Sequence, residues 1–226
     1  RDIVKGRSFK ALVTAGPTRE YIDPVRYISN ESSGKQGYEI AIALNKLGIQ
    51  TTLITGPSSL VSPKGVKVKK IISAEQMLNE VEKTLPVDLA VCTAAVADFK
   101  PAEQSKNKIK KDKFKLNSIN FIKNNNILDF LSKNNRHRPK IVAGFSAETK
   151  SVIKNSIQKM KNKNCDIIFA NDVSKKNIGF NSEFNKVSMI DQKGNVKIIP
   201  KNKKSFIANK IAQILLDKLI DDRNIN

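Results

Sequence analysis

Four short segments of small and polar residues stand directly after apolar, strand-like runs, and their residue types could do chemistry. They are Gly16 to Glu20, Ala94 to Asp98, Gly144 to Thr149, and the pair Asn171-Asp172. In open α/β sheets, ligands bind beyond the carboxyl ends of the strands. Small residues at such ends let backbone N–H groups approach a ligand closely. The pattern therefore predicts one binding site that is assembled from several strand ends.

A further candidate is the segment Ser32-Ser33-Gly34-Lys35-Gln36-Gly37, which precedes a predicted helix. The N–H groups and the dipole of a helix start favour an anion there. The segment is not a Walker A loop, because position 29 is not Gly and Gln36 replaces the Ser or Thr that would hold magnesium. The alternative interpretation is an ordinary Ser N-cap, and the segment alone does not decide between the two.

Three other positions each have a chemical and a structural interpretation. Asp98 could hold a cation or a ribose hydroxyl, or it could be a helix cap or turn residue. The run Lys108-Ile109-Lys110-Lys111 could contact phosphates, or it could be a solvated charge run. Asn30 stands in a loop without periodicity, where Asn is usually a turn former.

Apolar periodicity predicts the elements that must position these residues. We expect buried strands at 10–15, 50–55, 88–93, 140–145 and 166–170, and helices at 37–47, 74–84, 126–134, 149–163 and 203–220. Ser73 and Gln76 have the spacing of a capping box for the second helix. Apolar runs at 187–190 and 196–199 flank a turn-forming segment and predict a hairpin.

Alternating strands and helices with a late hairpin predict an α/β fold, namely a three-layer, Rossmann-like domain with a mostly parallel mixed sheet. We expect a single domain over 1–226, with a linker-like start at 1–8 and a tail at 221–226. The segment 16–33 is expected to be a long polar loop. The Lys-rich segment 99–113 has no helical or strand period, and we expect it to be a mobile flap.

The composition narrows the function classes. The net charge is +20, but the excess is nearly all Lys, and the aromatic residues, 6% with no Trp, do not interleave with the basic runs. This disfavours nucleic-acid binding and is compatible with anionic small molecules. The apolar runs fall short of a membrane span, and the start has no apolar signal-peptide core. Cys92 and Cys165 are expected to be buried, reduced thiols of a cytoplasmic protein, and the lone His137 to be inert.

Taken together, the segments resemble those of the phosphopantothenoylcysteine synthetase family over about residues 10 to 220. Each matching string is weak alone, but their number and order are specific. The strings are Thr14 to Glu20, Asp23 to Asn30, Ser32 to Lys35 with Gly37, Thr93 to Asp98, Lys108 to Lys111, Gly144 to Thr149, Ala170 to Asp172, and Gly179 to Ser182 with Asn185.

The resemblance implies a phosphopantothenate–cysteine ligase that works in two steps. The carboxylate of 4′-phosphopantothenate attacks the α-phosphate of a nucleotide and releases pyrophosphate, and the amine of cysteine then attacks the activated carbonyl. The bacterial form of the motifs implies CTP with Mg²⁺, and Asp98 as the metal contact. The implied catalytic residues are Asn30 and Lys108. The implied nucleotide- and intermediate-binding residues are Gly16, Ser32, Ser33, Gly34, Lys35, Ala94, Ala95, Asp98, Lys110, Lys111, Gly144, Phe145, Ser146, Ala147, Glu148, Asn171 and Asp172.

The resemblance also implies partners. Such synthetases are often the C-terminal half of a bifunctional protein with a flavin-dependent decarboxylase, and the missing initiator Met would suit an excised half. A homodimer is implied, with the segment 23–28 at or near the interface. No nucleic-acid or membrane partner is expected.

Two other function classes compete with this one. The first is a nicotinamide-dependent Rossmann oxidoreductase. Gly16-Pro-Thr-Arg is not a G-x-G-x-x-G loop, and the strand end Leu53 to Gly56 has no ribose-binding carboxylate. The second is a nucleic-acid binder driven by the +20 charge, which salt-sensitive binding to arbitrary duplex DNA combined with no nucleotide binding would favour.

Overall fold

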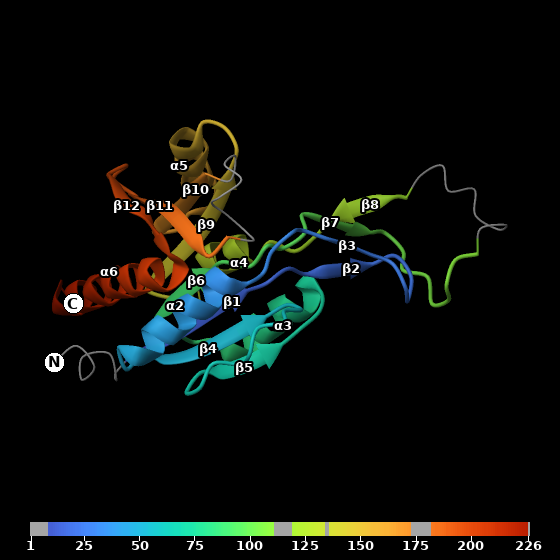
Figure 1. Cartoon of the computed structure of the whole chain (residues 1–226), viewed down its shortest axis with the longest axis horizontal. Helices are drawn as coiled ribbons and strands as arrows, with labels where there is room; N and C mark the ends of the chain where they lie inside the picture. Colours follow the sequence, from blue (N-terminus) through green and yellow to red (C-terminus); the bar gives the residue numbers. More distant parts are fainter. Residues whose placement is uncertain (1–8, 111–118, 134–135, 173–181, 226) are drawn as a thin grey trace.

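An eight-stranded mixed sheet forms the centre of the computed structural model, which describes residues 9–110, 119–133, 136–172 and 182–225 (Figure 1). The strand order is β12-β11-β10-β9-β6-β1-β4-β5. Its strands are β1 (Lys10–Ala15), β4 (Gln50–Thr55), β5 (Lys67–Lys70), β6 (Leu89–Cys92), β9 (Ile141–Glu148), β10 (Ile167–Asp172), β11 (Phe184–Asp191) and β12 (Val196–Lys203). Neighbouring strands from β5 to β10 are parallel, and β11 and β12 add an antiparallel hairpin. The predicted mostly parallel sheet with a late hairpin is therefore confirmed, whereas the edge strand β5 was not predicted.

Helices cover both faces of this sheet, so the predicted three-layer architecture is also confirmed. The helices α2 (Lys35–Lys46) and α6 (Lys204–Ile225) pack on one face, where their apolar side chains share a core with alternate residues of the strands. The second core lies on the other face, under α3 (Ala74–Thr84), α4 (Ile127–Lys133) and α5 (Val152–Lys163).

Local sequence signals set the start of two helices differently. Ser73 caps α3 in the predicted capping box: its hydroxyl accepts from the Gln76 N–H at 3.2 Å, and the Gln76 side chain accepts from the Ser73 N–H at 3.3 Å. The α2 helix begins at Lys35 rather than at the predicted residue 37, and its N-cap is Gly34 with φ 76°. The alternative interpretation of this segment as a Ser N-cap is therefore wrong.

Two short hairpins correct the prediction of unstructured segments at 16–33 and 99–113. The first pairs β2 (Arg19–Tyr21) with β3 (Tyr27–Ser29), and the second pairs β7 (Phe99–Pro101) with β8 (Phe121–Lys123). Three residues are too few to show the alternation of apolar and polar side chains that predicts a strand, so these strands could not be predicted from the sequence. Figure 1 shows both hairpins as an arm that extends away from the sheet and its helices.

A buried carboxylate at the tip of the first hairpin ties the arm together. Asp23 accepts from the N–H groups of Val25 and Arg26, each at 2.8 Å, and from the N–H of Ile109 at 3.2 Å. The Arg26 guanidinium beside it holds the pKa of Asp23 well below its usual range, and it also donates to the Ile109 carbonyl at 2.9 Å. The segment expected to be a mobile flap is therefore attached to the β2–β3 turn at Ile109.

The remaining general expectations can be compared with the described part of the chain. There, no helix has the length and apolarity that crossing a membrane requires. Both cysteines are free thiols; Cys165 is buried as expected, whereas Cys92 is only half-buried because it lines a cavity.

Gly56, which follows β4, provides a test of the close backbone packing under the site. A Cβ atom there would lie 1.7 Å from the Pro17 carbonyl oxygen, so Gly56→Ala should lower the free energy of unfolding by about 3 kcal/mol. Gly194→Ala is the control, because its Cβ would meet nothing within 4 Å and only its φ of +82° costs about 1 kcal/mol. Urea denaturation of both variants should show the larger loss at Gly56, and equal losses would contradict this packing.

Candidate active site

The loops that follow β1 and β6 lie side by side at the carboxyl edge of the sheet. The chain passes from β1 to β4 and β5 on one side and then returns to β6 on the other, so a topological switch point lies between β1 and β6. Pro17 and Ala95 pair across it, and the Ala95 N–H donates to the Gly16 carbonyl at 3.0 Å. Ligands of open α/β sheets bind at such a crevice.

Two buried threonines fix the backbone of the loop that follows β6. The Thr14 hydroxyl accepts from the Ala94 N–H at 3.4 Å, and the Thr18 hydroxyl accepts from the Ala97 N–H at 3.1 Å. The small side chains of this loop let its backbone lie against the loop from β1. The segment that ends at Asp98 is therefore held in one conformation before any ligand binds.

A cavity of about 300 Å³ opens beside this loop, and we call it the α2 chamber because the start of α2 forms one wall. It brings together twelve of the residues predicted to form the site. These are Asn30, Ser32, Ser33, Gly34, Lys35, Ala94, Ala95, Asp98, Phe145, Ser146, Ala147 and Asn171. Three of the four predicted strand-end segments contribute to this chamber, together with Asn30 and the segment that leads into α2, whereas Gly16 to Glu20 does not line it.

Glycines allow the start of α2 to lie directly against the strand ends. A Cβ atom on Gly37 would lie 2.3 Å from the Thr93 hydroxyl and 2.6 Å from the Ala15 Cβ. A Cβ atom on Gly34 would lie 3.2 Å from the Gly16 backbone. Because this contact is close, the first turn of α2 lies at the chamber wall, where the positive end of its dipole favours an anion. In the absence of a ligand, the Lys35 N–H donates to the Ser33 hydroxyl at 3.4 Å.

Asn30 is exposed at the mouth of the α2 chamber, and its side chain has a fixed orientation. Its Nδ2 donates to the Val96 carbonyl at 3.1 Å, which leaves a second N–H of the same amide for a ligand. The preceding Ser29 hydroxyl donates to the Thr18 carbonyl at 2.8 Å and anchors the backbone. The amide is therefore a positioned donor rather than only a turn former.

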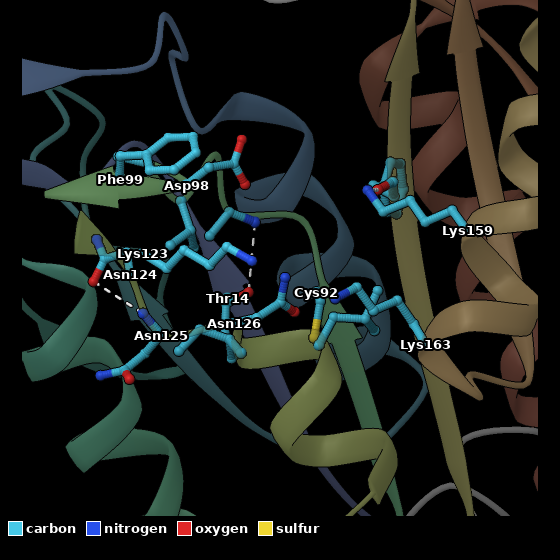
Figure 2. Close-up of a pocket in the computed structure, with 16 residues that line it drawn as sticks. Thr14, Cys92, Asp98, Phe99, Lys123, Asn124, Asn125, Asn126, Lys159 and Lys163 are labelled. Atoms are coloured by element: carbon cyan, nitrogen blue, oxygen red, sulfur yellow. Dashed lines mark hydrogen bonds between the residues drawn. The ribbon is translucent and has the colours of Figure 1, made fainter. Parts of the chain in front are cut away.

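A second cavity of about 350 Å³ lies on the other side of the β6 loop, and we call it the α5 chamber. Figure 2 shows Lys159 and Lys163 of α5 across the opening from the segment of Lys123, Asn124, Asn125 and Asn126. Three lysines and three amides make this chamber cationic and rich in hydrogen-bonding groups. Such a lining suits a phosphorylated or polar ligand.

The two chambers meet at a shared wall. Ala94, Val96, Asp98, Phe145 and Lys159 line both of them. The Lys159 ammonium donates to the Phe145 carbonyl at 2.9 Å, and burial lowers its pKa, although the carboxylates of Glu148 and Asp98 oppose this effect. Ligands that occupy the two chambers would therefore meet beside Asp98 and Lys159.

The half-buried thiol of Cys92 in the α5 chamber is a poor nucleophile. Burial raises the pKa of Cys92 to about 12, so the thiol stays protonated at neutral pH. The thiolate is the reactive form of cysteine. The structure therefore gives no support to covalent catalysis by this residue.

Several predicted site residues line neither chamber. The backbone of Gly16 lies against Gly34. Gly144 is part of β9 and faces Leu128 of α4. The Glu148 carboxylate accepts a hydrogen bond from the Ser146 hydroxyl at 2.7 Å. Lys108 and Lys110 flank the anchored Ile109 on the arm. Lys111 and the side chain of Asp172 lie outside the described part of the structure. The roles assigned to these residues stay predictions.

Sequence analysis missed several residues that line the chambers, namely Lys123, Asn124, Asn125, Asn126, Lys159, Lys163 and Lys204. The lysines stand in a chain with 41 Lys and Arg residues, so no spacing distinguishes them. The amides stand in an Asn-rich stretch that looks like a compositional bias. Only the fold separates these side chains from their neighbours.

Asp98 is the one predicted metal contact. Within the described ranges, no group of three or more His, Cys, Asp and Glu side chains could hold a metal ion. Mg²⁺ is usually bound through one or two carboxylates together with substrate phosphates and waters. A single carboxylate at the shared wall fits a magnesium ion that arrives with a nucleotide, rather than a resident metal centre.

Comparison with known proteins identifies the family. Residues 6–219 match the family described as DNA/pantothenate metabolism flavoprotein C-terminal domain. The chain is 40% identical over 217 residues to the coenzyme A biosynthesis bifunctional protein CoaBC of Borreliella burgdorferi, which covers 95% of this chain and 54% of the relative. For the Haemophilus influenzae protein of the same name, identity is 42% over 204 residues, covering 90% and 50%. The chain thus spans about half the length of these curated relatives.

Solved structures agree with this match. The crystal structure of the C-terminal domain of CoaBC superposes with a TM-score of 0.80 at 33% identity and covers 96% of this chain and 98% of that one. A Cab2 mutant in complex with phosphopantothenate-cysteine has a TM-score of 0.75 at 14% identity, with coverage of 96% and 89%, which shows the shared fold alone. The chain belongs to the DNA/pantothenate metabolism flavoprotein C-terminal domain family.

Proposed function

We propose that the chain is a phosphopantothenate–cysteine ligase of coenzyme A biosynthesis. The observation that carries the proposal is the convergence of the family's motif residues on two chambers that share one wall. A ligase of this kind must hold two phosphorylated substrates with their reacting groups in contact. Two cationic cavities that meet at Asp98 and Lys159 suit that requirement. The names of the relatives, which include coenzyme A biosynthesis, support the same reaction.

The first step would join the two substrates. The carboxylate of 4′-phosphopantothenate attacks the α-phosphate of CTP, the P–O bond to the β-phosphate breaks, and an acyl-cytidylate and pyrophosphate result. The N–H groups at the start of α2, with Ser32, Ser33 and Lys35, would bind the charge on phosphate oxygens. A magnesium ion that arrives with CTP would contact Asp98 and offset phosphate charge.

The second step would form the amide. The cysteine amine attacks the activated carbonyl, the tetrahedral intermediate collapses, and CMP leaves. Asn30 is placed to donate its second amide N–H to the developing oxyanion, because the first is already bonded to Val96. A neutral donor is suited to this position, since it stabilises negative charge without adding any.

Lys108 would act from the arm. It lines neither chamber in the free protein, and its neighbour Ile109 is bonded to Asp23 and Arg26. We propose that the segment 99–110 moves over the bound nucleotide as a lid, so that Lys108 reaches the α-phosphate. Exclusion of water would protect the acyl-cytidylate from hydrolysis.

We also propose a homodimer and a fused decarboxylase in the full-length protein. Five large apolar side chains are exposed on the arm, namely Val25, Tyr27, Phe99, Phe121 and Ile122. An exposed apolar patch on an extended arm suits a contact between two copies of the chain. The fusion is supported by the bifunctional relatives, of which this chain covers about half.

The proposed reaction and its nucleotide can be tested by product analysis. With 4′-phosphopantothenate and cysteine, CTP should support turnover much better than ATP and should give CMP and pyrophosphate. Mass spectrometry and a pyrophosphate assay would identify these products. Comparable rates with ATP would contradict the choice of nucleotide. Release of CDP with free phosphate would contradict the acyl-cytidylate.

A panel of two variants tests the catalytic roles. Asn30→Ala should lower kcat by about 100- to 1000-fold, which is the usual loss for one oxyanion donor. Lys108→Gln should also lower kcat, and both variants should keep their Tm within a few degrees, because the two side chains are exposed. Steady-state kinetics, CTP affinity and thermal melts would be measured together. A near-normal kcat in either variant removes that residue from the mechanism, and a failure of Asn30→Ala to fold favours its structural role.

The dimer can be tested with a matched pair of aspartate variants. Val25 on the arm is 57% exposed and Ile198 on the edge strand β12 is 59% exposed, so each change places a charge on a similarly exposed apolar site. Val25→Asp should shift the mass measured by light scattering from dimer to monomer, and Ile198→Asp should not. A monomeric unmodified protein, or a dimer that survives Val25→Asp, would refute an interface at the arm.

A further inference from the structure

Lys204 is a buried cation that the mechanism above does not use. It is the first residue of α6, it is 4% exposed, and it lines the α2 chamber. Lys35, the first residue of α2, lines the same chamber. The two helices pack against each other on one face of the sheet (Figure 1). Both of their starts lie at the α2 chamber, because Lys35 and Lys204 both line it.

A network of hydrogen bonds fixes the backbone at Lys204. Gln36 donates through Nε2 to the Lys204 carbonyl at 3.3 Å and accepts from the Asn185 amide at 3.0 Å. The Lys204 N–H donates to the Glu183 carbonyl at 2.9 Å. Residues from α2, β11 and α6 therefore hold the start of α6 in place beside the start of α2.

Positive charge accumulates at this point of the chamber. A lysine in the first turn of a helix is unfavourable, because the helix dipole is positive there, and this applies to both Lys35 and Lys204. Glu183 forms an ion pair with Lys35, and its negative charge also acts on Lys204. The Glu183 side chain is 70% exposed, so one solvated carboxylate faces two lysines. Burial, and then the charge of Lys35, lower the pKa of Lys204 to about 8. The surroundings of Lys204 thus disfavour its charged form. A bound anion would stabilise the charged ammonium and would raise its pKa again.

The chamber also contains a polar atom that a ligand could satisfy. Among the residues that the structure describes, the side-chain oxygen of Asn171 is buried and has no hydrogen-bond partner. A buried acceptor without a donor destabilises the free protein. A ligand with both an anionic group and a donor, such as a nucleotide, would complement the chamber.

We propose that Lys204 is a phosphate-binding residue, which binds with Lys35 and the start of α2 a phosphoryl group of one of the two phosphorylated substrates. The identity of those substrates rests on the proposed function, whereas the phosphate site itself does not. The ligand would replace Glu183 as the partner of the two lysines. Glu183 is exposed and can turn out to solvent.

This role predicts opposite effects on stability and on binding. Because the folded-state pKa lies below the ordinary value of 10.5, the buried ammonium lowers the stability of the free protein at neutral pH. Lys204→Met keeps the apolar stem and removes the charge, so the free protein should melt at the same or a higher temperature. A purely structural lysine would give the reverse result.

Calorimetry on the whole chain tests the proposal with inorganic pyrophosphate, CTP, CMP, 4′-phosphopantothenate and pantothenate. Lys204→Met should weaken the binding of pyrophosphate and of one phosphorylated substrate by about 10- to 100-fold. Lys203→Met is the control, because the adjacent Lys203 is exposed and lines neither chamber; it should change binding less than threefold. If Lys204→Met does not fold, Lys204→Gln replaces it.

The choice of ligands identifies the source of the phosphate. A loss for CTP but not for CMP assigns Lys204 to the β- or γ-phosphate, and a loss for both assigns it to the α-phosphate. A loss for 4′-phosphopantothenate but not for pantothenate assigns it to that substrate. Unchanged binding of all five ligands would overturn the proposal. Pyrophosphate binding that depends on Lys204 in a protein without ligase activity would uphold the phosphate site and refute the proposed reaction.

Discussion

The site depends on one constraint, the close contact of the loops that follow β1 and β6. Pro17 and Ala95 pair directly, and buried hydroxyls of Thr14 and Thr18 hold the second loop by its N–H groups. Gly56 lies so close to Pro17 that no side chain fits there. Because both chambers are built on the second loop, its fixed backbone sets where each of them opens and where their shared wall stands.

Several lysines lie around this rigid centre, where they line the two chambers. Lys35, Lys159 and Lys204 are among them. Lys35 forms an ion pair with the exposed carboxylate of Glu183, whereas burial lowers the pKa of Lys159 and of Lys204. Another ion pair, between Asp23 and Arg26, lies away from the chambers on the arm. Lysines that line cavities favour phosphorylated ligands, and lowered lysine pKa values of this kind are typical of a binding site. The net charge of +20 therefore says little about function by itself, and only the lysines that the fold places in the chambers indicate a ligand.

The arm contributes in a different way, since it is anchored by polar contacts and exposes its apolar residues. Asp23 joins the first hairpin to Ile109, whereas Val25, Tyr27 and Phe121 face outward. The segment 99–110 is held at further points, because the Ser105 N–H donates to the Ile22 carbonyl at 2.9 Å and Lys100 forms an ion pair with Glu75 of α3. The exposed apolar side chains remain available for the contact with a second copy that is proposed above.

The sequence by itself determined the sheet, the three layers and the residues at the strand ends, because buried strands and amphipathic helices leave strong periodic patterns. It also determined the family resemblance, because the motifs and their order along the chain are read directly from the sequence. It did not reveal the edge strand β5, which has three lysines among its four residues, or β2, β3, β7 and β8, which are three-residue strands without a period. Nor could it distinguish Lys159 and Lys204 from the other lysines, because burial beside a cavity is a property of packing between distant segments. Only the tertiary structure decided which basic residues face the chambers.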